Sequence, residues 1–189
     1  EMEAKVEMEY RADYDSVTGL YNSEAFYQRA SEMIHMHNNA TFAILSIDID
    51  RFRIINDRFG IDVGNKILQQ LGRAIKEVTP KHSLAKRYQA DHFSVIMMYQ
   101  SDQEIIDYMT RLSDRAGEYF EKQWCISLSY GIYKVVDNSL PIRLMCDRAR
   151  IVKKQIKGNS LSNFAVYDDK IRLQQREQAE IESEMNAAL

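Results

Sequence analysis

Residues 42–52 read Phe42-Ala43-Ile44-Leu45-Ser46-Ile47-Asp48-Ile49-Asp50-Arg51-Phe52. The run opens with consecutive apolar residues, several of them β-branched, which is typical of a buried strand. It ends in two carboxylates, and a carboxylate is costly to bury without a partner. At the exit of a strand, however, an acidic side chain can hold a cation, and oxygen ligands suit Mg²⁺. We therefore interpret Asp48 as a candidate metal ligand at a strand end.

A second carboxylate that could converge on Asp48 comes from a predicted hairpin. Residues 84–88 and 93–98 read as two strands, and only Gln89-Ala90-Asp91-His92 lie between them. If this hairpin packs beside the first strand, Asp91 lies next to Asp48, and a carboxylate pair suits metal-assisted phosphoryl transfer. On spacing alone a second interpretation stays open, in which Asp48 caps a helix and Asp91 is a turn residue.

Five motifs, in sequence order, resemble those of GGDEF domains, the diguanylate cyclase family. Asp48 to Gly60 with Gly64 resembles "DIDxFKxxND-xxGHxxGD", and residues 87–93 stand in the place of "RYGGDEF". The other three motifs are residues 15–22, similar to "DxLTGLxNR", residues 127–132, similar to "vtvSiGia", and residues 147–159, similar to "ADxALYxAKxxGxN". The resemblance extends over roughly residues 13 to 167.

The predicted element order is β-α-α-β-β-α-β-α-β, which implies an α+β fold with a mixed sheet covered by helices. The resemblance implies the same architecture, a five-stranded central sheet flanked by helices, as in nucleotidyl-cyclase and polymerase palm domains. We expect residues 1–13 to be a signalling helix from an upstream sensor, residues 14–167 the GGDEF domain, and residues 168–189 a helical connector. For the last segment two interpretations stay open: a frayed chain end, or a connector to a downstream EAL phosphodiesterase domain.

Hydrophobic spacing places the remaining elements. Helices are predicted over residues 23–37, 52–59, from 62 or 64 to Pro80, 102–120 with Asp102 as cap, and from Pro141 to Gly158. Strands are predicted over residues 125–133 and 164–167. The helix at residues 102–120 should face the core with Ile105, Ile106, Met109 and Leu112. The helix from Pro141 to Gly158 should do so with Leu144, Met145, Ala149 and Val152.

Composition excludes several classes of protein. The chain has 189 residues, 45% of them hydrophobic, which supports one domain with a real core. A net charge of −3 argues against nucleic-acid or membrane binding driven by charge. Cys125 and Cys146 read as buried free thiols in a reducing compartment. No apolar run approaches a membrane span and no signal peptide is visible, so we expect a cytoplasmic domain, excised from a longer protein that could itself be membrane-anchored.

The resemblance also implies a role for individual residues. Asp48, the carbonyl of Ile49 and Asp91 would hold Mg²⁺ weakly, and Asp91 and His92 would be the catalytic residues. Guanine would be read by Asn56 and by Asn65, where the family has Asp. Because an Asn amide presents a donor as well as an acceptor, one guanine contact is lost or reversed. The remaining nucleotide-binding candidates are Phe52, Arg53, Gln89, Ala90 and Lys154.

The departures from the family pattern fall at positions to which the resemblance assigns a catalytic, binding or inhibitory role. Gln89 and Ala90 replace two glycines, which permit positive φ and close approach of phosphate. His92 replaces an acidic residue, and histidine is a poor Mg²⁺ ligand. Residues 80–83, Pro-Lys-His-Ser, occupy the place of the family's inhibitory Arg-x-x-Asp site, so we expect no feedback inhibition there.

Three functions follow from these residues. The first is a regulatory domain without catalysis that senses a nucleotide, and the four departures favour it over the second, a cyclase of original or altered specificity that condenses two GTP in a homodimer. The third is a ligand-free dimerisation scaffold, which the sequence does not separate from the first. The expected partners are GTP or another purine nucleotide held weakly, a second copy, and sensor and EAL domains in the same chain.

Overall fold

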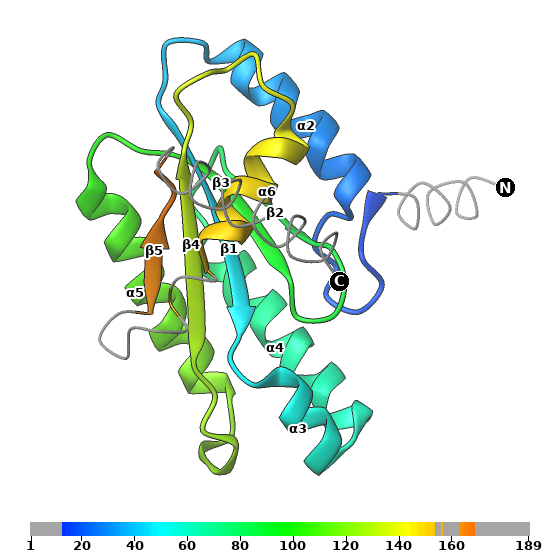
Figure 1. Ribbon diagram of the computed structural model, residues 1–189. Helices are drawn as coiled ribbons and strands as arrows, with labels where there is room; N and C mark the ends of the chain where they lie inside the picture. The colour runs from blue at the N-terminus through cyan, green and yellow to red at the C-terminus, as the bar shows by residue number, and fades with distance from the viewer. Residues whose placement is uncertain (1–12, 154–155, 157–162, 169–189) are drawn as a thin grey trace, which may run out of the picture.

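The computed structural model describes residues 13–153, 156 and 163–168. Its centre is a five-stranded sheet in the order β2-β3-β1-β4-β5, with β1 (Phe42–Ile49) in the middle (Figure 1). The other strands are β2 (Leu84–Arg87), β3 (Phe93–Met98), β4 (Leu128–Lys134) and β5 (Phe164–Val166). All neighbours are antiparallel except β4 and β5, which are parallel. The predicted five-stranded mixed sheet is therefore confirmed.

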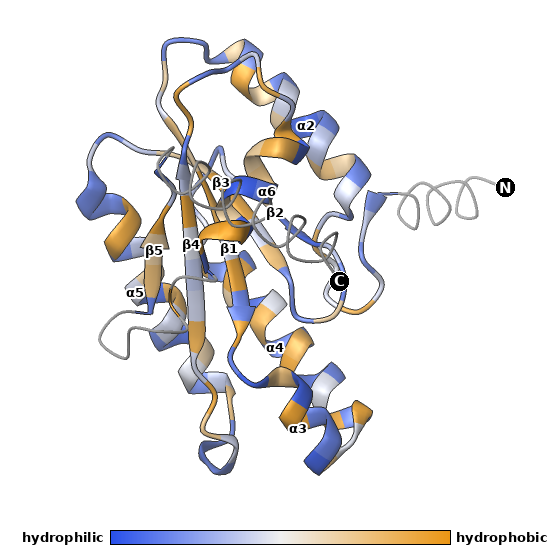
Figure 2. Ribbon diagram, in the orientation of Figure 1, coloured by the Kyte–Doolittle hydropathy of each residue, from blue (hydrophilic) through white to orange (hydrophobic). Residues whose placement is uncertain are grey.

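The central strand is enclosed on both faces. Every residue of β1 is buried except Asp48, which is half-buried. Its register sets Ser46 opposite Ser94 of β3 and opposite Gly131 of β4. Figure 2 shows β1 as mainly hydrophobic and the connection to the next helix as hydrophilic. The apolar run at residues 42–47 thus forms the buried strand that its composition predicts.

Helices cover the sheet in two layers (Figure 1). The helices α4 (Ile61–Val78) and α5 (Asp102–Tyr119) pack on one face, where alternate residues of β1 such as Leu45 and Ile47 join their core. The helices α2 (Ser23–Met36) and α6 (Ile142–Val152) pack on the other face, around Ile44. Two apolar clusters therefore flank one sheet, because side chains of a strand alternate between its faces.

Local signals account for one boundary each of α2 and α3. The side chain of Asn22 accepts a hydrogen bond from Ala25 N at 3.0 Å and so caps α2. The short helix α3 (Phe52–Phe59) has the predicted bounds and ends at Gly60, whose φ of +91° suits glycine. The helix α4 follows immediately. Within the described residues, none of the helices has the length and apolar character needed to cross a bilayer.

Two predictions about helix faces are wrong. Ile106 and Leu144 are 38% and 41% exposed, although both were expected to face inward. In α5 the buried stripe runs through Ile105, Met109 and Leu112, and the neighbour of a buried residue lies about 100° further round the helix. The capping prediction also needs correction, because Asp102 is the first residue of α5 and Ser101 precedes it as the N-cap residue.

The strand prediction for residues 125–133 begins too early. Residues Lys122–Trp124 form a 3-10 turn, and Cys125 follows in the left-handed region with φ of +47°. The chain enters the sheet only at Leu128. Cys125 is therefore exposed rather than buried, whereas Cys146 on α6 is buried as expected.

The close approach of α6 to β4 leads to a first prediction. A Cβ atom at Gly131 would lie 1.9 Å from the backbone oxygen of Ala149, so Gly131→Ala must push the helix away from the sheet. We expect a loss of about 1–3 kcal/mol in the free energy of unfolding, as is usual for overpacking. Urea-induced unfolding followed by circular dichroism measures it.

The matched control for this change is Gly117→Ala on the exposed face of α5. A Cβ atom there meets nothing within 4 Å. Because alanine is favoured over glycine inside a helix, the control should gain about 0.5–1 kcal/mol. Equal changes in the two variants would contradict the assignment of Gly131 as a packing position.

Candidate functional site

The end of β1 meets the turn between β2 and β3. Ile47 lies opposite Phe93, so the hairpin packs beside the first strand as predicted. His92, the residue before β3, donates a hydrogen bond from Nδ1 to Asp48 Oδ1 at 2.9 Å. Asp48 does not cap a helix, because Arg51 is the N-cap residue of α3 and its side chain makes no capping hydrogen bond.

A lysine that the sequence analysis overlooked also reaches Asp48. Lys153, at the C-terminal end of α6, forms an ion pair with Asp48 Oδ1, and its side chain is 8% exposed. Among the described residues Lys153 Nζ makes no hydrogen bond of ordinary geometry, so charge rather than a directed bond holds it there. Lys153 occupies the alanine position of the "ADxALYxAKxxGxN" motif, and that substitution was the available signal.

The four charged or titratable groups shift one another's pKa. Burial alone would raise the pKa of Asp48, but the His92 hydrogen bond and the Lys153 charge together lower it below its ordinary value. The pKa of Asp91 is raised by burial and by the nearby Asp48 charge. The pKa of Lys153 is lowered, because burial outweighs the attraction of Asp48. Asp48 therefore stays ionised while it accepts the His92 hydrogen bond and forms the ion pair with Lys153.

The turn itself keeps the conformation of a glycine-containing loop. Ala90 has φ of +49°, in the left-handed region that glycine tolerates best. The guanidinium of Arg87 holds the turn by donating from Nε to the Ala90 carbonyl oxygen at 2.8 Å. The same side chain donates to Asp15 at 2.9 Å, and Asp15 accepts from Thr18. The turn is thereby tied to the segment that precedes α2.

A second group of candidate residues comes from α3 and from the first turn of α4. The side-chain oxygen of Asn56 is buried and has no hydrogen-bond partner among the described residues. It lies over Gly64, where a Cβ atom would be 1.9 Å from Asn56 Oδ1. An unpaired buried oxygen of this kind is unusual. Asn65, the next residue, is half-buried.

The other predicted site residues are more scattered. Phe52, the first residue of α3, is buried in the core and packs near Gly64 of α4, so it has a structural role. The Arg53 side chain is almost fully exposed, 4.0 Å from the carboxylate of Asp57. Gln89 is exposed on the turn, Ile49 is buried at the end of β1, and Lys154 lies outside the described residues. The structure thus brings Asp48, Asp91 and His92 together, and it sets the Asn56 side chain against Gly64 of α4.

The donor set does not fit a Mg²⁺ ion. Oxygen Oδ1 of Asp48 already faces a histidine donor and a lysine ammonium. Mg²⁺ demands a nearly ideal octahedral shell of oxygen ligands. Within the described part of the chain, no three His, Cys, Asp or Glu side chains converge in a way that could hold a metal ion.

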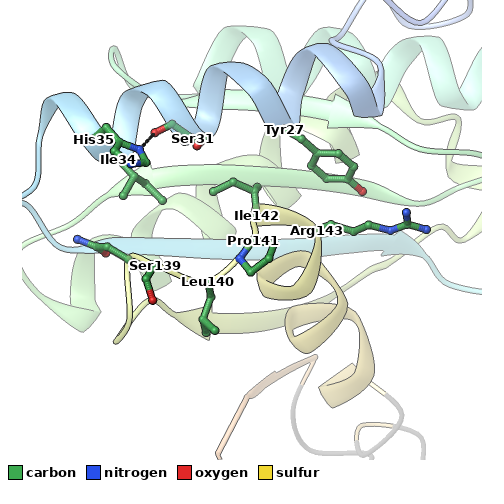
Figure 3. Close-up of a pocket in the computed structure, with 10 residues that line it drawn as sticks. Tyr27, Ser31, Ile34, His35, Ser139, Leu140, Pro141, Ile142 and Arg143 are labelled. Carbon is green, nitrogen blue, oxygen red and sulfur yellow. Dashed lines mark hydrogen bonds between the residues drawn. The ribbon is translucent and has the colours of Figure 1, made fainter.

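A groove separate from the Asp48 cluster lies near the start of α6, whereas Lys153 follows the end of that helix. It has a volume of about 480 Å³ and lies between α2 and the start of α6 (Figure 3). Tyr27 and His35 come from α2, and His35 donates from Nδ1 to the Ser31 carbonyl oxygen at 2.8 Å. Arg143 comes from the first turn of α6. None of the predicted site residues lines this groove.

Comparison with known proteins identifies the family. Residues 12–160 match the model described as "Diguanylate cyclase, GGDEF domain", which covers more than half of the chain. The chain belongs to the GGDEF family. The turn at residues 89–92 is accordingly the GGDEF signature turn of this chain, with Gln, Ala and His in three of its positions.

The relatives include proteins named as diguanylate cyclases and proteins named as cyclic di-GMP phosphodiesterases. The chain is 31% identical over 108 residues to diguanylate cyclase DgcP of Escherichia coli, covering 56% of this chain and 32% of that protein. It is 23% identical over 193 residues to cyclic di-GMP phosphodiesterase NbdA of Pseudomonas aeruginosa, covering 98% and 24%. The chain thus spans about a third or less of these relatives.

A solved structure supports the fold. The coiled coil and GGDEF domain of DgcB from Caulobacter crescentus, in complex with c-di-GMP, superposes with a TM-score of 0.74. The alignment covers 87% of this chain and 91% of that solved chain at 17% identity. The sheet order and helix layers described above are therefore those of GGDEF domains.

The contact between His92 and Asp48 predicts a pH dependence. The hydrogen bond to Asp48 raises the pKa of His92 above its ordinary value of 6.5, against burial, and the charges of Asp48 and Asp91 add to the rise while Lys153 opposes it. A group whose folded pKa is raised stabilises the fold below its unfolded pKa and loses that contribution as pH rises through the folded pKa. Folding should therefore weaken by up to about 1 kcal/mol between about pH 6 and pH 8.

This prediction is tested with His92→Gln. Urea unfolding at several pH values should show a smaller change of unfolding free energy for the variant than for the wild type. His35→Gln is the control, because its imidazole bonds the carbonyl oxygen of Ser31 on the surface of α2. An unchanged slope in His92→Gln would show that the His92–Asp48 contact does not contribute to stability.

Proposed function

We propose that this GGDEF domain is a regulatory module of cyclic di-GMP signalling that does not itself condense GTP. The observation that carries the proposal is that the Asp48 carboxylate is already engaged by His92 and Lys153. The carboxylate that the family resemblance assigns to metal binding accepts a hydrogen bond from His92, the residue that replaces the last acid of the signature. A carboxylate engaged in this way is not free to take part in phosphoryl transfer.

The electrostatics of the second carboxylate support the same conclusion. Burial and the Asp48 charge raise the pKa of Asp91, so the pair resists carrying two negative charges. Metal-assisted phosphoryl transfer depends on ionised carboxylates that hold the metal ions. His92 adds a donor where the family signature has an acid.

The signature turn supports the proposal independently. Ala90 keeps the left-handed conformation but adds a methyl group where the family has glycine. Gln89 adds a long exposed side chain beside it. Close approach of a triphosphate to backbone N–H groups is easiest where no side chain intervenes. The loop therefore preserves its shape while its surface has changed.

The proposal predicts no measurable cyclase activity. The protein is incubated with GTP and either Mg²⁺ or Mn²⁺, and the products are separated by chromatography. An active diguanylate cyclase treated in parallel is the positive control. Formation of cyclic di-GMP at even a hundredth of the usual enzyme median of about 10 s⁻¹ would refute the proposal and favour the cyclase alternative, which needs a homodimer.

A second candidate activity is the sensing of a purine nucleotide, and Asn56 favours it. Its buried oxygen lacks a partner among the described residues, and a guanine or adenine donor would provide one. Asn65 stands where the family has Asp, so guanine loses part of its advantage over adenine. We propose weak binding of GTP and ATP with similar affinity.

This binding is tested by thermal-shift titrations with GTP and ATP, with and without Mg²⁺. Asn65→Asp should restore a preference for GTP of about tenfold or more, because a lost hydrogen bond to a buried partner costs about 1–3 kcal/mol. Asn38→Asp, an exposed position at the end of α2, is the charge-matched control. No shift with either nucleotide at millimolar concentration would leave the ligand-free scaffold as the better proposal.

The regulated partner that we propose is a downstream EAL domain in the same chain, with a cytoplasmic location for both. The match to NbdA supports this proposal, because it covers 98% of the present chain and NbdA is named a cyclic di-GMP phosphodiesterase. An upstream sensor domain would supply the signal. The predicted signalling helix and C-terminal connector fall largely outside the described residues.

A further inference from the structure

Two lysines are buried within the described residues, and their charges are balanced in different ways. Lys86 Nζ has no carboxylate partner among the described ion pairs. It donates to the Tyr27 hydroxyl at 2.8 Å and lies 4.2 Å from the centre of the Tyr27 ring. Lys153 instead pairs with Asp48 at the end of the central strand. The positive charge of Lys153 therefore stands where the family resemblance expects a divalent cation.

Lys153 reaches Asp48 by passing over Gly131 of β4, which has no side chain. Lys153 follows α6 with helical backbone angles, φ −61° and ψ −25°. Its stem lies over Gly131, where a Cβ atom would come within 2.8 Å of Lys153 Cγ. Gly131 is opposite Ser46, which lies on the same face of β1 as Asp48 two residues later. Glycine in β4 thus leaves room for the stem, and the ammonium ends at Asp48.

The contacts at Asp48 are incompatible with an added metal ion. One oxygen, Oδ1, faces both the Lys153 ammonium and the His92 donor. A Mg²⁺ ion at this oxygen would have to displace both groups, and at either oxygen of Asp48 it would be repelled by the buried ammonium. An ammonium cannot move far into water when its side chain is 8% exposed and packed against the sheet. The ion pair therefore competes with any divalent cation for the same carboxylate.

We propose that Lys153 is a built-in cation that replaces the divalent metal ion at Asp48, so that the folded domain neither needs nor binds Mg²⁺ there. This inference deepens the proposed function, because it names the group that closes the site. The alanine of the family motif at this position suggests the decisive variant. Lys153→Ala removes the ammonium and leaves Asp48, Asp91 and the Ile49 carbonyl to a metal ion.

The experiment uses Mn²⁺ alone, without nucleotide, as the probe. Binding is measured by isothermal titration calorimetry and by the loss of the free Mn²⁺ signal in electron paramagnetic resonance. Lys153→Ala should bind Mn²⁺ at least about tenfold more tightly than the wild type, and adding Asp48→Asn should abolish the gain. Lys153→Arg keeps the charge and should behave like the wild type. Lys134→Ala, which breaks an ion pair with Asp102 elsewhere, is the matched control.

Three results would overturn the inference. The first is Mn²⁺ binding by the wild type that Asp48→Asn abolishes, and the second is a folded Lys153→Ala that binds no more tightly than the wild type. The third is a Lys153→Arg variant that binds like Lys153→Ala. If Lys153→Ala fails to fold, the wild type and Asp48→Asn decide, since equally weak binding in both upholds the inference.

The outcome is separable from that of the cyclase assay. A wild-type domain that binds Mn²⁺ at Asp48 but forms no cyclic di-GMP would overturn this inference and leave the proposed function standing. A domain that forms cyclic di-GMP would refute the proposed function, whatever the metal titration shows.

Discussion

Burial of β1 on both faces is the constraint on which the rest of this structure depends. Because helices cover each side of the sheet, any charge on the strand needs compensation from another element. Asp48 is the residue of β1 that the sheet leaves half-buried. His92 comes to it from the hairpin on one side and Lys153 from α6 on the other. The site is therefore a consequence of sheet order as much as of residue identity.

The GGDEF signature turn keeps its backbone path through contacts within the domain. The bonds from Arg87 to the Ala90 carbonyl oxygen and to Asp15 hold the turn without involving any ligand. They maintain a left-handed residue that costs a non-glycine side chain about 1–2 kcal/mol. The backbone path of the turn thus persists, while the side chains that the path presents have changed.

Much of the fold could be predicted from the sequence alone, for identifiable reasons. The apolar run at residues 42–47 and the four-residue connection at residues 89–92 predict β1 and its neighbouring hairpin. The predicted bounds of the short helix at residues 52–59 are also correct, and Gly60 ends that helix through local backbone chemistry. Register within the sheet then follows, because a slip of one residue would turn the apolar side chains of β1 to the wrong face.

Other features depend on how helices rotate and approach the sheet. Ile106 and Leu144 are as apolar as their buried neighbours, and only the packed orientation of α5 and α6 leaves them exposed. Cys125 is exposed because the chain makes a 3-10 turn before β4, which hydrophobic spacing does not reveal.

The sequence by itself determined the family, the sheet and the identity of the altered signature residues. Only the tertiary structure decided what those residues do to Asp48. Lys153 lies 105 positions after Asp48 in the chain, and its side chain reaches the carboxylate because Gly131 lets α6 approach β4 closely. Ion pairs between distant segments depend on packing distances of a few ångströms, and such distances follow from the assembled core rather than from local sequence pattern.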